Sequence, residues 1–190
     1  MTQIESFGSL FGMGMTLETH RAWSRDTTLL LAFAAFVIAP LGAYLFSKLL
    51  KGRFPWVRLA IVLLFILFIA FETVIGRPPL RRYRPTFTPF ASYANLQKKT
   101  IQRQILCNIM VFVPLGFLLN WGTGLSFLKT VLLCLLISLS IEFTQLMLKV
   151  GYCETDDLIH NTLGSIIGYW YFELLAYIKR RLFDTGAKTG

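Results

Sequence analysis

The stretch 27–46 strongly limits what this chain can fold into, because it runs for about 20 residues without a charge. A helix of that length spans the hydrocarbon core of a bilayer. Further apolar runs cover residues 59–76, 105–121, 130–148 and 157–178. Hydrophobic residues make up 55% of the 190 residues and charged residues only 15%, which is too apolar for a soluble domain. We therefore predict an all-α, polytopic membrane protein, a bundle of about five transmembrane helices.

The apolar runs divide the chain into four parts. Residues 1–26 form a tail or an interfacial segment, 27–76 two leading transmembrane helices, 77–179 a core with a loop and three transmembrane helices, and 180–190 a basic tail. The net charge of +9 comes from basic residues that flank the apolar runs. This distribution is typical of a membrane surface and not of a nucleic-acid-binding face.

The loop between the second and third predicted helices is basic and rich in proline. Its four prolines, within residues 77–89, rule out a continuous helix there. Arg81, Arg82 and Arg84 cluster around Tyr83. Guanidinium groups suit phosphate oxygens, so we expect these arginines to contact the phosphate of a lipid headgroup. The alternative is a general electrostatic anchor on anionic lipid.

Several polar residues fall inside the apolar runs, where they are costly unless they serve a purpose. Glu142 and Gln145 share a helix face, as do Asp157 and Asn161, and Asn108 lies one turn inside its span. With five spans, loops 77–104 and 149–156 lie on one side of the membrane. These five residues and Glu72 then occupy one half of the bilayer, and we predict a one-sided polar pocket covered by the basic loop.

Four ordered motifs carry a resemblance to a known family. They are Thr88-Pro89-Phe90, NIMVFVPLGFLL from Asn108, SLSIEFTQ from Ser138 and DDLIHNTLGSIIGY from Asp156. Over residues 77–169 the chain resembles the VanZ family of bacterial membrane proteins, so 77–179 is the VanZ-like core. The family's namesake is associated with resistance to teicoplanin and related lipoglycopeptides, which implies a cellular context and no particular reaction.

The resemblance also implies site residues and one departure. The positions carried over are Asn108, Glu142, Gln145, Asp157 and Asn161. Where such proteins usually have an arginine, then an aromatic residue and an aspartate, this chain has Gly151, Cys153 and Glu154. If that arginine contacts an anionic ligand in relatives, Arg81 or Arg82 must serve here, or the ligand differs.

Three classes of function remain open. The pocket could bind or pass an anionic lipid or lipid-linked glycan headgroup, contributing to glycopeptide resistance or cell-envelope homeostasis. It could be a membrane-embedded enzyme acting on a lipid-linked substrate, with Glu142 or Asp157 as general base and His160 as partner. It could also be a structural or accessory subunit whose polar cluster locks helices together.

We expect no cofactor and no metal site, since the sequence has no metal-binding spacing. The expected partners are membrane lipids with anionic headgroups, together with a lipid-linked cell-wall precursor or a lipoglycopeptide, and not nucleic acid. The expected location is the bacterial cytoplasmic membrane, crossed several times, with the pocket facing outside. The oligomeric state stays open.

Overall fold

The computed structural model describes residues 55–75, 84–151 and 153–183, together with scattered helical positions between residues 34 and 49. The named helices are α3 (Pro55–Ala70), α4 (Lys99–Thr123), α5 (Phe127–Leu148) and α6 (Thr155–Phe183). The π-helix η1 (Phe71–Ile75) extends α3, and the short 3-10 helix η2 (Ala91–Asn95) precedes α4. Within the described residues there is no β-strand, only an isolated bridge between Thr86 and Glu154. The predicted all-α class is confirmed for this part of the chain.

Three helices of the described part are long and apolar enough to cross a membrane: Trp56–Ile75, Lys99–Thr123 and Phe127–Leu148. They correspond to the second, third and fourth predicted spans, and the membrane class of the chain follows from them. α6, which contains the fifth predicted span 157–178, lies outside this set although it has 29 residues. The predicted span 27–46 falls largely outside the described residues, so a total of five spans stays a prediction.

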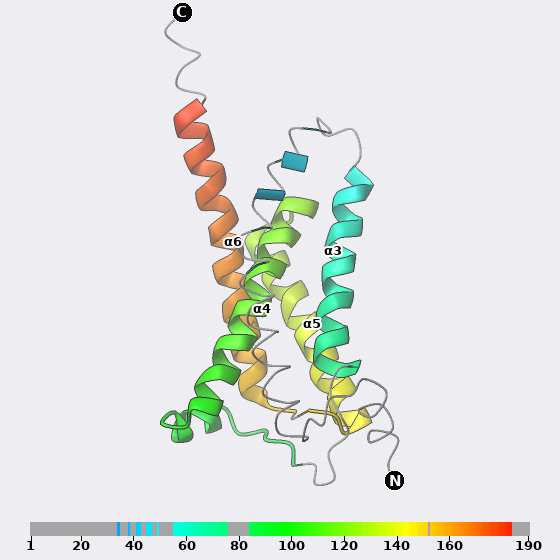
Figure 1. Ribbon diagram of the computed structural model, residues 1–190, viewed down its shortest axis with the longest axis vertical. Helices are drawn as coiled ribbons and strands as arrows, with labels where there is room; N and C mark the ends of the chain where they lie inside the picture. The colour runs from blue at the N-terminus through cyan, green and yellow to red at the C-terminus, as the bar shows by residue number, and fades with distance from the viewer. Residues whose placement is uncertain are drawn as a thin grey trace, which may run out of the picture.

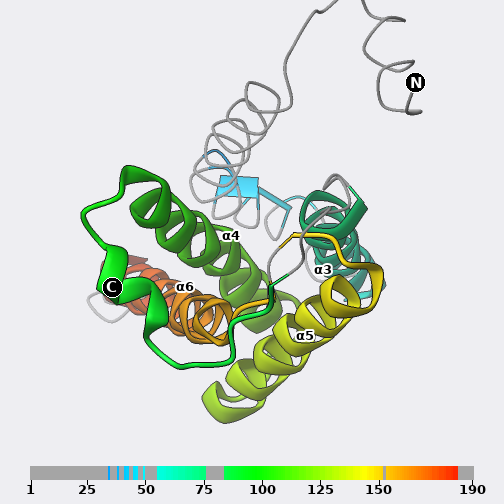
Figure 2. The ribbon, with the colours of Figure 1, turned by 90° about the horizontal axis from the view of Figure 1, so that it is seen from below.

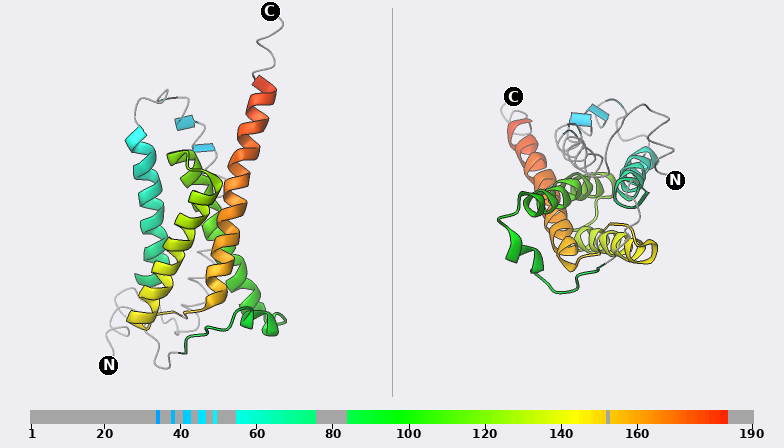
Figure 3. Two further views of the ribbon diagram at one scale, coloured as in Figure 1. Left: turned by 180° about the vertical axis from the view of Figure 1, so that it is seen from behind. Right: turned by 60° about the horizontal axis from the view of Figure 1, so that its bottom comes forward.

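α4 lies between α3 and α6 and packs most extensively on α6 (Figures 1 and 3). Glycines of α6 allow it to approach α4 closely. A Cβ on Gly168 would lie 2.0 Å from the carbonyl oxygen of Val113, and one on Gly164 would lie 2.3 Å from that of Ile109. Only glycine permits such an approach, which is the usual way for helices to pack closely in a membrane. Pro114 stays inside the continuous helix α4.

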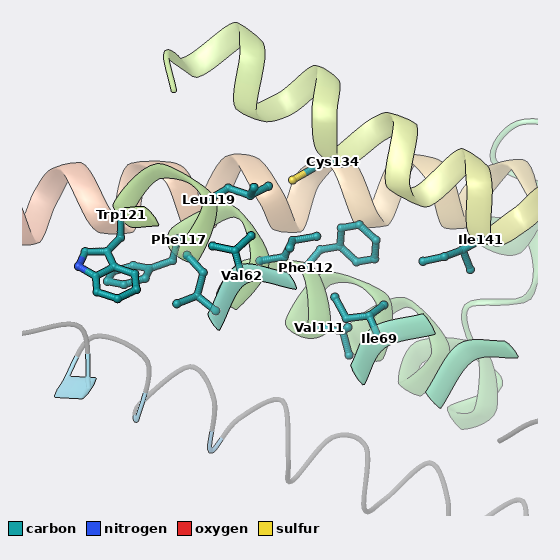
Figure 4. Close-up of a cluster of buried hydrophobic side chains, with 11 residues drawn as sticks. Val62, Ile69, Val111, Phe112, Phe117, Leu119, Trp121, Cys134 and Ile141 are labelled. Atoms are coloured by element: carbon teal, nitrogen blue, oxygen red, sulfur yellow. The ribbon is translucent and has the colours of Figure 1, made fainter. Parts of the chain in front are cut away.

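The apolar core joins α3, α4 and α5 (Figure 4). Val62 and Ile69 of α3 pack against Phe112 and its neighbours on α4, with Ile141 of α5 beside them. Other large apolar side chains point outward, including Leu64 of α3 at 66% exposure and other leucines of α3 and α5. An apolar outer face over an apolar core is what a lipid environment requires.

The helix ends that carry the predicted site residues lie together. The start of α4, the end of α5 and the start of α6 meet at one end of the bundle, at the bottom of Figure 1. The C-terminal end of α6 projects beyond the other helices at the opposite end.

Candidate functional site

Polar side chains from the start of α4, from α5, from the α5–α6 connection and from the start of α6 are here called the polar cluster. Its members are Gln104, Asn108, Ser138, Glu142, Gln145, Glu154, Asp157 and Asn161. Glu142, Gln145, Asp157 and Asn161 are each at most 5% exposed. Burial of carboxylates at this depth is costly, so each hydrogen bond in the cluster matters.

Two bonds tie α5 to the start of α6. The Asn161 side-chain amide donates to the Ser138 hydroxyl over 2.8 Å. The backbone N–H of Glu154 donates to the Glu142 carboxylate over 3.1 Å. The i, i+4 spacing on α5 therefore turns Ser138 and Glu142 toward the α5–α6 connection, as the helix period predicts.

Gln104 links α4 to the same connection. Its Nε2 donates to the Glu154 carboxylate over 2.9 Å and also reaches Asp157 Oδ1 at 3.4 Å. Sequence reasoning missed both Gln104 and Glu154. The available signal for Gln104 was its position four residues before Asn108, which places the two side chains on one helix face.

Gln145 connects the cluster to α3 through an irregular backbone. Its Nε2 donates to the carbonyl oxygen of Thr73 over 3.0 Å. Thr73 belongs to the π-helix η1, in which the i→i−4 ladder of α3 is broken. Such π-helical turns are often found at functional sites. Glu72, in the same turn, is half-buried.

Three buried polar atoms have no hydrogen-bond partner in the described part of the chain: Asn108 Nδ2, Gln145 Oε1 and His160 Nδ1. A buried polar group left unpaired costs about 1–3 kcal/mol. One of these atoms is a donor and one an acceptor, and the imidazole nitrogen can be either according to its tautomer. Asn108 and Gln145 therefore give the cluster hydrogen-bonding capacity that the described residues do not use.

A second set of contacts, here called the loop clamp, fastens residues 86–93 to the start of α6. The Asp156 carboxylate accepts the backbone N–H of Phe90 and, over 2.7 Å, that of Ser92. The Tyr93 hydroxyl lies 3.1 Å from His160 Nε2. Thr86 adds two backbone bonds, to Cys153 and from Thr155.

The loop clamp gives Asp156 and His160 partners outside the polar cluster. Asp156 lies just before the predicted span 157–178. Burial raises the pKa of Asp156, but the N–H donors of Ser92 and Phe90 outweigh burial, so this pKa lies below its ordinary value. The contact of His160 is with Tyr93, where the sequence suggested a role beside Glu142 or Asp157.

The polar cluster and the loop clamp lie within the region that matches a known protein family. Residues 56–176 match the VanZ/LLP1 family. The chain belongs to the VanZ/LLP1 family. One curated relative of this VanZ/LLP1 chain is Protein VanZ of Enterococcus faecium, 32% identical over 82 residues. That alignment covers 43% of this chain and 47% of the relative, so the chain matches about half of the relative's length. No solved structure matches the chain.

The basic residues expected near the site of this VanZ/LLP1 protein are only partly described. Arg81 and Arg82 lie outside the described residues, whereas Arg84 is exposed. Gly151, where the family resemblance implies an arginine in relatives, takes a positive φ of 63°, which a side chain would strain. Among the residues the structure describes, no three His, Cys, Asp or Glu side chains are placed to hold a metal ion.

Proposed function

We propose that this VanZ/LLP1 protein binds or passes an anionic lipid or lipid-linked glycan headgroup in the polar cluster. In the cell it would contribute to resistance to glycopeptide or lipoglycopeptide antibiotics of the teicoplanin type, or to cell-envelope homeostasis. The observation that carries this proposal is the cluster of buried carboxylates and amides, in which Asn108 Nδ2 and Gln145 Oε1 have no partner among the described residues.

The chemistry of the unpaired atoms favours a ligand rich in hydroxyl groups. A hydroxyl both donates and accepts, so it can bond an amide N–H such as that of Asn108 and an amide oxygen such as that of Gln145. The carboxylates of Glu142 and Asp157 add acceptors for further hydroxyls. Phosphate oxygens only accept, so the phosphate of such a headgroup is better served by Arg81, Arg82 and Arg84.

A purely structural cluster explains fewer of these contacts. Interhelical hydrogen bonds in membranes are worth about 0.6 kcal/mol on average, which is small beside the cost of burying carboxylates. A set selected only for packing would also pair its buried atoms, because unpaired ones destabilise the fold. An enzyme is the other alternative, with Glu142 or Asp157 as general base. The contact of His160 with Tyr93 gives it less support than ligand binding has.

The carboxylates supply the first test. We expect Glu142→Gln and Asp157→Asn to leave the amount of folded protein unchanged and to abolish resistance in a host that depends on this protein. Glu173→Gln, at the opposite end of α6, is the matched control and should retain resistance. Loss of folded protein in either cluster variant would favour the structural role, and turnover of a lipid-linked substrate would favour the enzyme.

The arginines supply the second test. Native mass spectrometry of the detergent-extracted protein should show retained phosphatidylglycerol that is lost when Arg81 and Arg82 are both changed to Gln. Changing Arg180 and Arg181 to Gln removes the same charge at the far end of the bundle and should leave the lipid bound. If the wild type retains no lipid, the headgroup proposal loses its main support.

Orientation needs a different probe from the native cysteines, because Cys153 is buried. Thr88 is exposed in the loop beside the cluster. Thr88→Cys in a cysteine-free background should react with a membrane-impermeant thiol reagent added to intact cells, which would place the cluster on the outer side. Reaction only after permeabilisation would place it on the cytoplasmic side.

A further inference from the structure

We propose that residues 84–98, here called the anchor segment, form an in-plane membrane anchor that docks on an anionic bilayer surface. The segment contains η2 and leads directly into Lys99, the first residue of a helix able to cross a membrane. It therefore lies at the level of the headgroups, where a transmembrane helix begins. Seen from below the bundle, it runs around the start of α6 before it enters α4 (Figure 2).

The outer face of the anchor segment is aromatic and exposed. Phe87 is 63% exposed, Phe90 61% and Tyr93 43%. Phe90 and Tyr93 also contact each other edge to face, with ring centroids 5.9 Å apart. Exposed aromatic rings that lie beside a transmembrane helix suit the membrane interface, where an apolar ring and a polar backbone are both accommodated.

The charges of the segment indicate which bilayer it prefers. Arg84 and Lys98 are exposed within it, and Lys99 is exposed directly after it. No acidic residue occurs anywhere in residues 77–104. Basic side chains beside interfacial aromatic rings favour an anionic surface over a neutral one. A protein partner would need complementary acidic groups, whereas an anionic bilayer is already present at this level.

The inner face of the segment is fixed by the loop clamp. The N–H groups of Phe90 and Ser92 are directed inward to Asp156, and the Tyr93 hydroxyl is directed to His160. These bonds satisfy polar groups that the interface would otherwise have to solvate, and they leave the rings of Phe87 and Phe90 exposed. Because Asp157 of the polar cluster is the next residue after Asp156, lipid docking on the segment helps hold the cluster in place. The docking itself does not depend on any ligand of the cluster.

The experiment places tryptophan on the anchor segment of the full chain. Phe87→Trp and Phe90→Trp are made in a background whose native tryptophans are changed to Phe, and each is reconstituted into nanodiscs of phosphatidylcholine and phosphatidylglycerol in equal parts. We expect blue-shifted emission and quenching by lipids brominated near the headgroup. Leu67→Trp, on the exposed face of α3, is the control and should be quenched by lipids brominated deep in the chains.

Two results would overturn the proposal. Emission at the wavelength of tryptophan in water, with quenching by iodide and not by brominated lipid, would show that the segment does not dock on the bilayer and would leave a protein partner as its occupant. Equal quenching in pure phosphatidylcholine and in the mixture would overturn the preference for anionic lipid. We expect Arg84→Gln with Lys98→Gln to reduce quenching in the mixture only.

Discussion

The two ends of the helix bundle handle buried polar groups differently. At the far end, the Asn120 side chain donates to Glu173 over 2.9 Å, and Arg58 lies over the Trp121 ring at 5.7 Å from its centroid. In these contacts the polar side chains have partners within the protein. At the cluster end, Asn108 and Gln145 each keep a buried atom without a partner in the described chain. A polar pair whose atoms bond each other can hold two helices together, whereas buried atoms without a partner can still bind a ligand.

The glycine contacts between the two ends should give the largest effect when broken. Gly168→Val would place a side chain against the Val113 carbonyl oxygen, from which even a Cβ would be only 2.0 Å away. We expect destabilisation of about 3 kcal/mol or more and loss of monodisperse protein in detergent, measured by thermal unfolding and size exclusion. Gly42→Ala, where nothing lies within 4 Å, is the control. A Gly168→Val protein that is as stable and monodisperse as the wild type would mean that α4 and α6 can move apart at this contact.

The loop clamp should give the next largest effect. In Asp156→Asn the single amide oxygen replaces two carboxylate oxygens, so one of the two N–H groups, from Phe90 or Ser92, loses its acceptor. We expect the free energy of unfolding to fall by about 1–3 kcal/mol and hydrogen exchange at these two amides to become faster. Mass spectrometry measures the exchange. Unchanged exchange at both amides would contradict the clamp. Glu173→Gln should not affect exchange in the loop.

The two asparagines test the comparison directly. Asn120→Leu removes the partner of Glu173 and should lower stability by about 1 kcal/mol while resistance is retained. Asn108→Leu removes an unpaired buried donor, so stability should stay the same or rise while resistance is lost. Thermal unfolding and the minimum inhibitory concentration of teicoplanin would be measured for both. If Asn108→Leu is the less stable of the two, Asn108 has a packing role.

Sequence reasoning grouped the polar residues of α5 on one buried face but did not find every partner. The 3.6-residue period placed Ser138, Glu142 and Gln145 on one face because α5 is regular. It singled out Asp157 and gave the adjacent Asp156 no partner, since that partner depends on where the irregular segment 84–98 lies. Thr73 was also missed, because a π-helical turn follows no period that a sequence displays.

The smallest expected effect concerns pH at the loop clamp. The pKa of Asp156 lies below its ordinary value, so its charged form stabilises the fold above the pKa of the unfolded chain, and this stabilisation is lost as pH falls through the lower folded pKa. The difference in stability between wild type and Asp156→Asn should therefore be constant near neutral pH and shrink below about pH 4. Thermal unfolding of both proteins across this range measures it. A difference that persists unchanged in acid would mean that the N–H groups of Phe90 and Ser92 do not favour the charged carboxylate. Hydrogen bonds between neutral groups, such as the one from Asn161 to Ser138, would then account for the stability of this end of the bundle.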